Sequence, residues 1–364
     1  MSKNNNSGFD SFQLISPVIL ILYLSIGFVP NWEAVDKIAP QWLVMALLNF
    51  CSLLLFFFNR NSLSKRITSS LVSGISLTYI CFILWASLSY FYAINPTEVL
   101  VNITRQFNVL FMFLTMGILL FSLKNKLNLI PWIVTVILGI EVYAVLNDAL
   151  EMLNTTGYIS PGELKGVTAN RNITAFSIAI KIPFVLFLIY RTKKLSYKLI
   201  ASSLIFLALF SLSMIESRAS FIGVLVIIIS FCVQNFYLYF KENLKLKSLF
   251  NIGYLLGPLL FAIILNQIYV ADKGADAISR AATISFSTND GSVNQRLRYY
   301  EDVLVHLKKN PILGTGLGNW KLKSIEYDAK DIVGYVVPYH AHSDFIQLGA
   351  ELGIIGFLLY LGVF

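Results

Sequence analysis

The histidines are the side chains of this sequence best suited to acid–base chemistry, because an imidazole titrates near neutral pH. There are three of them, His306, His340 and His342. His340 and His342 immediately precede the last apolar run, and His342 fits the role of a general base. The pair has no third ligand at the spacing of a zinc site, so we expect no metal. His306 stands beside Lys308 and Lys309, and we expect it at a solvated surface.

Arginines supply the groups that would bind a phosphate. Arg218 closes a very short connection between two apolar runs, so its charge stays near the membrane surface. A guanidinium held there suits a lipid-borne phosphate, because its fork binds phosphate oxygens bidentately. The structural alternative is an arginine that only reaches the headgroups or pairs with Glu216. Arg296 precedes the histidine pair in the same polar segment and can serve the same phosphate, whereas the nearby Arg298 is a weaker candidate.

Two opposite charges lie deep inside apolar runs. Glu141 lies about nine residues from the outer end of one run and Lys181 about nine from the outer start of the next, so both lie ~14 Å deep at ~1.5 Å per residue. Unpaired charges at that depth cost several kcal/mol, so we expect the two to pair. The pair either locks two helices together or serves an ion or proton relay.

The elements that position these residues are membrane helices. The 364 residues are 56% hydrophobic and 13% charged, with a mean hydropathy of +0.69. Soluble domains carry about a quarter charged residues, so this composition excludes an ordinary soluble protein. Apolar runs of about 18 residues or more recur along the chain, which is typical of spanning helices. The net charge of +8 falls in short clusters between these runs, so it does not indicate nucleic-acid binding.

Ten spans are expected, and together they predict an all-α, polytopic transmembrane helical bundle. They are Leu14–Pro30, Gln41–Phe58, Leu71–Tyr92, Gln106–Leu123, Ile130–Leu150, Asn172–Tyr190, Lys198–Ile215, Ala219–Phe240, Ser248–Tyr269 and Asp344–Phe364. Every second connection is rich in Lys and Arg, which marks the cytoplasmic side. We therefore expect a cytoplasmic tail at 1–13, nine spans in 14–269, an outer, periplasmic loop at 270–343 and a last span at 344–364.

The outer loop carries its own helix signal. Ser292 and Gln295 have the spacing of a capping box, and the sequence stops the helix at Asn310-Pro311. Its apolar face is expected at Leu297, Tyr300, Leu304 and Leu307, lying along the membrane or against the bundle. A turn with three glycines follows at 314–318. It lacks the lysine and strand–turn–helix context of a nucleotide site, so we expect a close-packing turn.

Several motifs resemble the bacterial O-antigen ligase and O-antigen polymerase superfamily. Arg296 with Tyr300, and Pro311 with the glycine turn, are similar to its Arg-three-residues-aromatic and Pro-x-x-Gly-x-Gly signatures. The run from His342 to Glu351 and beyond is similar to its His-Asn…Glu-x-Gly-x-x-Gly signature, although Ser343 replaces the Asn. Further matching motifs are Ser217-Arg218 and Gly166…Asn170-Arg171-Asn172. Family members often have further spans after this point, so the natural protein is expected to continue past residue 364.

This resemblance implies a nucleotide-independent enzyme without a cofactor that transfers a glycan from undecaprenyl diphosphate in the bacterial inner membrane. It assigns leaving-group stabilisation to Arg218 and Arg296 and proton removal from the acceptor to His342. Further substrate contacts are expected from Arg298, His340, Asn170 and Asn172. Transfer to lipid A–core or another periplasmic acceptor defines a ligase, whereas transfer to a second lipid-linked glycan defines a repeat-unit polymerase. The sequence leaves both open, and a glycan or solute transporter is the alternative from another class.

Overall fold

The computed structural model describes residues 5–123, 125–168, 170–241, 246–284, 291–329 and 339–364, and the regular structure in these ranges is helical, with no strand. In lipid a helix satisfies its backbone hydrogen bonds within itself, which explains why the long apolar runs form helices. The expected all-α, polytopic bundle is confirmed. The helices group into two compact units.

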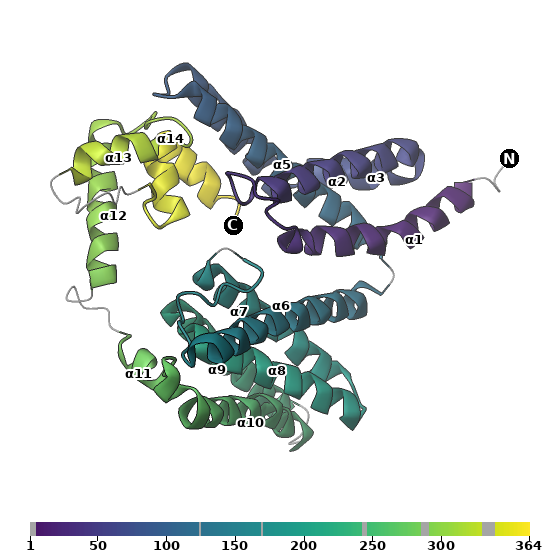
Figure 1. Ribbon diagram of the computed structural model, residues 1–364. Helices are drawn as coiled ribbons and strands as arrows, with labels where there is room; N and C mark the ends of the chain where they lie inside the picture. The colour runs from purple at the N-terminus through teal and green to yellow at the C-terminus, as the bar shows by residue number, and fades with distance from the viewer. Residues whose placement is uncertain (1–4, 124, 169, 242–245, 285–290, 330–338) are drawn as a thin grey trace. The chain divides into compact units, whose positions relative to one another are not determined.

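The first unit combines helices from the N-terminal third of the sequence with helices from its C-terminal part (Figure 1). Its elements are α1 (Asn5–Leu24, except its last residue), α2 (Ala39–Phe58), α3 (Arg60–Leu71), α4 (Gly74–Leu88), η2 (Ser89–Phe91), α5 (Pro96–Ser122), α12 (Gly291–Lys309), α13 (Trp320–Asp328) and α14 (Asp344–Leu361). Helix α14 packs against α4 and α12, and α4 also packs against α5. The early spans therefore support the late ones.

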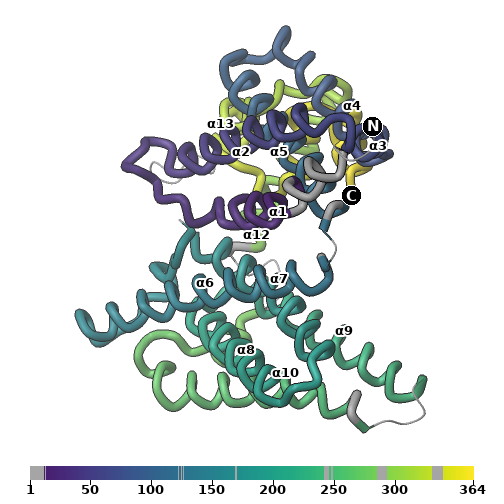
Figure 2. The backbone as a smooth tube through the Cα atoms, turned by 90° about the vertical axis from the view of Figure 1, so that its right-hand side faces the viewer, coloured from purple at the N-terminus to yellow at the C-terminus, as the bar shows by residue number. Residues whose placement is uncertain are grey.

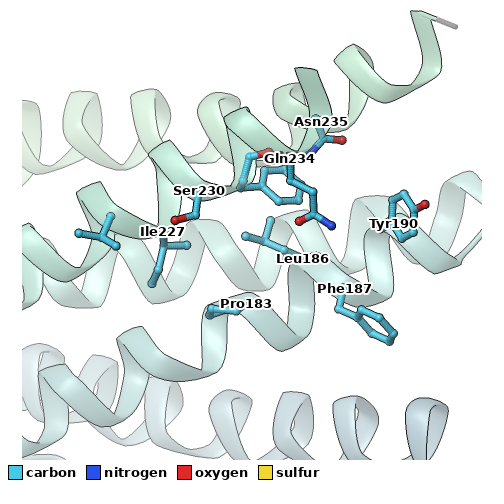
Figure 3. A pocket seen from close by; sticks show the side chains of 10 residues that line it. Pro183, Leu186, Phe187, Tyr190, Ile227, Ser230, Gln234 and Asn235 are labelled. Atoms are coloured by element: carbon cyan, nitrogen blue, oxygen red, sulfur yellow. Dashed lines mark hydrogen bonds between the residues drawn. The ribbon is translucent and has the colours of Figure 1, made fainter. Parts of the chain in front are cut away.

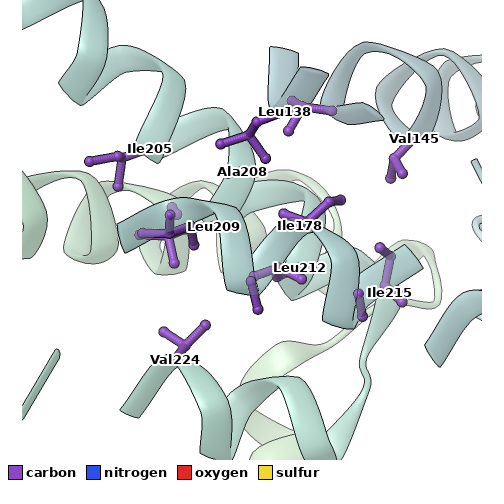
Figure 4. Packing of buried hydrophobic residues seen from close by; sticks show 14 of the residues in the cluster. Leu138, Val145, Ile178, Ile205, Ala208, Leu209, Leu212, Ile215 and Val224 are labelled. Atoms are coloured by element: carbon purple, nitrogen blue, oxygen red, sulfur yellow. The ribbon is translucent and has the colours of Figure 1, made fainter. Parts of the chain in front are cut away.

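The second unit is a helical bundle with a continuous apolar core. Its elements are η1 (Ile26–Phe28), α6 (Lys126–Thr156), α7 (Arg171–Arg191), α8 (Leu195–Ile215), α9 (Arg218–Lys241), α10 (Leu246–Tyr269), η3 (Ala271–Lys273) and α11 (Ala277–Ala282). Helix α8 contacts α6, α7 and α10, and α10 also contacts α9 (Figure 2). Ile178, Leu209 and Leu212 lie fully or almost fully buried at the centre of this core (Figure 4).

Nine helices of the described part are long and apolar enough to cross a membrane, one fewer than expected. They are α2, α4 with η2, α5, α6, α7, α8, α9, α10 and α14. The expected span that is not among them is the first, Leu14–Pro30. Helix α1 ends at Leu24, and Leu14–Leu24 is a shorter apolar helix within the residues that the structure describes, so this span stays a prediction.

The helix expected in the outer loop is α12, but its buried face differs from the expected one. It begins at Gly291, one residue before Ser292, so Ser292 is not its N-cap; it ends at Lys309 before Asn310-Pro311, as predicted. Leu297 and Leu304 are 41% and 58% exposed, whereas Tyr299, Val303 and His306 are buried. The reason is that α13 and α14 pack on that second face, and α13 carries no helical signal in the sequence.

Candidate active site

Within the first unit, the imidazole of His342 stacks on a tyrosine ring. His342 lies just before α14 in the left-handed region, with a φ of 56°. Its ring lies nearly parallel to that of Tyr299 on α12, with centroids 5.8 Å apart and planes 13° apart. The Tyr299 hydroxyl in turn accepts a hydrogen bond of 2.8 Å from Gln295 Nε2. Tyr299 is 5% exposed, so it forms a fixed platform for an exposed imidazole.

Two basic residues act on this imidazole. Partial burial lowers the pKa of His342 below its ordinary value of 6.5, and the neighbouring Arg296 and His340 lower it further. Arg296 is exposed on α12, one turn before Tyr299. A neutral imidazole next to a permanent cation has the properties of a general base beside an anion-binding group. Three of the predicted residues, His342, Arg296 and His340, therefore act on one another electrostatically.

A buried carboxylate organises the backbone on which His342 sits. Glu351 on α14 is 2% exposed, and its Oε1 accepts a hydrogen bond of 3.0 Å from Gln347 Nε2. The other end of the Gln347 amide, Oε1, accepts from the backbone N–H of Ala341 at 3.3 Å. Glu351 Oε2 accepts from the N–H of Gly318 at 2.7 Å. One carboxylate thus connects the residue before His342 with the glycine turn.

The glycine turn packs closely against α14, as the sequence predicts. The N–H groups of Thr315 and Gly316 donate to the carbonyls of Ala350 and Glu351 at 3.0 and 2.8 Å. Gly314 has a φ of +68°, and a Cβ there would lie 2.5 Å from the Ala350 carbonyl oxygen. Only glycine combines this conformation with such an approach. The turn is also fixed to the α4 side, since Ser89 Oγ accepts from Leu317 N at 3.1 Å.

One expectation for α12 is wrong, and another, the substrate contact of Arg298, stays a prediction. His306 is 1% exposed instead of solvated: its Nδ1 lies 3.0 Å from the Tyr327 hydroxyl, and burial and Lys323 lower its pKa. Arg298, expected to bind substrate, pairs with the buried carboxylate of Asp328 at 2.9 Å. Both contacts join α12 to α13, so these side chains hold the platform together.

Arg218 belongs to the second unit, where it is the first residue of α9. Its Nε donates to Thr283 Oγ1 at 3.2 Å. Glu216 lies in the left-handed region, with a φ of 54°. Burial raises its pKa above the ordinary value, and Arg280 and Arg171 offset only part of this rise. The Glu216 carbonyl accepts from Arg280 Nε at 3.2 Å. The connection between α8 and α9 is therefore bound to α11 through two arginines, one of which the sequence analysis did not select.

Comparison with known proteins adds to this geometry. Residues 203–361 match a family model described as O-antigen ligase. A protein of Rickettsia bellii named "Putative polysaccharide ligase" is 26% identical over 301 residues, which cover 79% of this chain and 66% of that protein. Another putative polysaccharide ligase, from Rickettsia typhi, is 26% identical over 295 residues, covering 78% of this chain and 65% of that protein. One from Rickettsia conorii is 30% identical over 161 residues, covering 43% of this chain and 35% of that protein.

These matches show that the chain is similar to the O-antigen ligase superfamily, in agreement with the resemblance of its motifs. The chain spans just under two thirds of the length of the first two relatives. Together with the nine candidate spans among the described residues, this similarity indicates a multi-pass membrane protein. The matched region contains Arg218, Arg296 and His342.

The remaining predicted residues lie outside the matched region. Asn170 caps α7, because its Oδ1 accepts from Asn172 N at 2.8 Å, while the Asn172 side chain is exposed. Lys181 Nζ lies 2.9 Å from both carboxylate oxygens of Glu141, so the two charges form the expected contact. Ser177 Oγ also donates to Glu141. The substrate contacts of Asn170 and Asn172 stay predictions.

A further groove of about 320 Å³ lies between α7 and α9 and contains none of the predicted residues (Figure 3). Pro183 and Leu186 of α7 face Ile227 and Ser230 of α9 across it. Its lining is mostly apolar and it lies on two candidate spans, so it is a part of the lipid-facing surface. Among the described residues, no cluster of three His, Cys, Asp or Glu side chains includes His340 and His342.

Proposed function

We propose that this protein transfers a glycan from undecaprenyl diphosphate to a hydroxyl of lipid A–core or another acceptor at the outer face of the bacterial inner membrane. The observation that carries the proposal is the stacking of His342 on Tyr299 next to Arg296, because it joins a base and a phosphate-binding group on one rigid support. The similarity to the superfamily supports the same reaction class.

The reaction follows from the charges of these groups. The neutral His342 imidazole takes the proton of the acceptor hydroxyl as its oxygen attacks the anomeric carbon. The bond from that carbon to the diphosphate oxygen breaks, and the electron pair leaves with the diphosphate. The donor is already activated, so the step requires no nucleotide. Inversion at the anomeric carbon follows from this single displacement.

The developing charge on the diphosphate requires fixed cations. Arg296 stabilises the charge on the leaving diphosphate. Arg218 is the second arginine in this role. Removing one such group costs typically about 10²–10³ in turnover. In the predicted orientation, residues 270–343 face the periplasm, where the lipid-linked glycan is presented. A reporter fused near Asn289 tests that orientation, and a cytoplasmic signal would contradict it.

The decisive experiment incubates purified protein with a glycan linked to undecaprenyl diphosphate, with and without lipid A–core. Glycan on lipid A–core is the expected product. Lengthening of the lipid-linked glycan instead would identify a polymerase. A protein that transfers no glycan but moves glycan or solute across the membrane of vesicles would be a transporter.

Variants identify the groups that act in transfer. We expect His342→Ala, Arg296→Ala and Arg218→Ala to reach the membrane in normal amounts and to lose transfer. Lys308→Ala is the matched control, because Lys308 is an exposed cation on the same helix as Arg296. Full activity in any of the three variants would remove that residue from the site.

A further inference from the structure

Helices α6, α7 and α8 of the second unit leave a groove at the end of the bundle where α7 ends and α6 and α8 begin. The groove has a volume of about 470 Å³, and small-molecule sites in proteins commonly have about 300–1,000 Å³. Asn128, Arg191 and Thr192 line its mouth. Thr135 and Leu204 line it nine residues into α6 and α8, so it extends ~14 Å along the helices. The groove therefore combines a polar mouth with a long, mainly apolar interior.

The mouth of the groove is positively charged. Arg191 Nη2 donates to Asn128 Oδ1 at 3.2 Å, and its guanidinium lies 5.8 Å from the centroid of the Phe187 ring, so both partners are uncharged. Lys193 and Lys194 follow as two further exposed cations. Within the described part of the chain, no carboxylate pairs with these three cations, and none of the lining residues is acidic. This charge is complementary to a phosphate group.

Two aromatic side chains join the helices across the groove. Trp132 on α6 meets Tyr197 on α8 edge to face, with ring centroids 6.2 Å apart and planes 78° apart. Both rings line the groove and stay partly exposed, and Lys194 Nζ lies 5.4 Å from the Tyr197 centroid. Trp and Tyr are enriched where membrane helices pass the lipid headgroups, because their rings have an apolar body and a polar edge. The ring pair therefore indicates that the mouth of the groove lies at headgroup level and its interior among the acyl chains.

We propose that this groove binds one anionic phospholipid, with its phosphate on Arg191 and the first part of an acyl chain along Leu188 and Leu204. In the predicted orientation the basic connection after α7 faces the cytoplasm, so the lipid belongs to the cytoplasmic leaflet. Basic pockets between membrane helices on that side bind anionic headgroups. The inference is independent of the transfer reaction, because none of the residues assigned to transfer lines the groove.

The test measures lipid binding to the full, delipidated chain in detergent by native mass spectrometry, with phosphatidylglycerol and with phosphatidylcholine at the same concentrations. The two lipids share the phosphate and the acyl chains, but only phosphatidylglycerol has a net negative charge. We expect one tightly bound phosphatidylglycerol and much weaker binding of phosphatidylcholine. Equal binding of the two lipids, or displacement of phosphatidylglycerol by inorganic phosphate alone, would overturn the inference.

The charge contact is tested in the same assay. Arg191→Gln should weaken phosphatidylglycerol binding about tenfold, because a hydrogen-bonded charge on the phosphate is lost. Arg60→Gln is the matched control: Arg60 is an exposed cation that lies 5.1 Å from the centroid of Phe57, as Arg191 lies over Phe187, but it does not line the groove. Equal losses of binding in the two variants would contradict a specific site at Arg191.

The position of the lipid is tested by filling the groove. Ile200→Trp places a large ring in the groove from an exposed position on α8 and should abolish binding of the tight phosphatidylglycerol. Leu199→Trp should leave binding unchanged, because Leu199 is the exposed neighbour and does not line the groove. Wild-type affinity in Ile200→Trp would place the lipid elsewhere and overturn the inference.

Discussion

The His342 imidazole lies flat against the Tyr299 ring, with planes 13° apart and centroids separated by 5.8 Å. Because His342 is otherwise exposed, this contact determines where its ring nitrogens point. We expect Tyr299→Leu to lower turnover about tenfold with little change in KM, since aromatic pairs contribute about 0.5–1.5 kcal/mol. Tyr299→Phe keeps the ring and should retain turnover. Equal losses in both variants would assign the effect to the hydroxyl instead of the stacking.

The lowered pKa of His342 gives a definite pH dependence. Protonated imidazole cannot accept a proton, so kcat/KM should fall with decreasing pH, with its midpoint below 6.5. Arg296 lowers this pKa, so the residual activity of Arg296→Gln should show its midpoint at higher pH. Lys308→Gln removes a charge from the same helix and should leave the profile in place. An unshifted pH profile in Arg296→Gln would show that Arg296 does not act on His342 electrostatically.

Glu351 should be as important for folding of the outer loop as His342 is for chemistry. Glu351→Ala leaves the Gly318 N–H and the Gln347 amide without their buried acceptor, which costs about 1–3 kcal/mol for each unpaired group. Thermal unfolding in detergent should occur at lower temperature, and protease should cut residues 310–343 faster. Glu301→Ala, an exposed change on α12, is the control. Wild-type protease resistance in Glu351→Ala would contradict the role.

Gly353 should tolerate no side chain. Its φ is +68°, and a Cβ would lie 2.0 Å from the carbonyl oxygen of Ile312. Gly353→Ala must therefore displace the segment before the glycine turn, and we expect less folded protein and no transfer. Gly139→Ala is the matched control, because nothing lies within 4 Å of a Cβ at this position on α6. Normal yield and activity of Gly353→Ala would show that the segment moves freely.

The pair of Glu141 and Lys181 offers a charge-exchange test. Glu141→Lys and Lys181→Glu each leave two like charges on neighbouring spans, so each should reduce the amount of folded protein in the membrane. The double exchange restores opposite charges and should recover part of the loss. If the double variant folds but transfer stays absent, the pair has a role beyond locking the helices together. If the double variant is no better folded than either single variant, the pairing of Glu141 with Lys181 is not what stabilises the protein.

The sequence predicted the bundle well because a spanning helix depends on local composition. Uncharged runs determine α2 and α4 through α10, and basic connections indicate the orientation. The same reasoning placed Arg296 and His342 in one polar segment, where motif resemblance selected them. The charges of Glu141 and Lys181 were paired by depth alone. These features depend on neighbours close in the chain or on membrane depth.

Other parts depend on contacts between distant segments. His306 was placed at the surface because Lys308 and Lys309 follow it, but Tyr327 arrives from a helix without a periodic signal. Tyr299 was not selected, since only the fold reveals its contact with His342. Glu351 did have a signal, because a lone carboxylate inside a predicted span is a functional candidate by itself.

The glycine turn depends on residues that follow it by about 35 positions in the chain. Helix α14 supplies the backbone carbonyls and the Glu351 carboxylate that fix Thr315, Gly316 and Gly318. During synthesis the turn therefore emerges from the ribosome before any of its partners exist. Helix α14 must be made and inserted before this segment can settle, so the turn cannot take its folded form on the ribosome until α14 has left the exit tunnel.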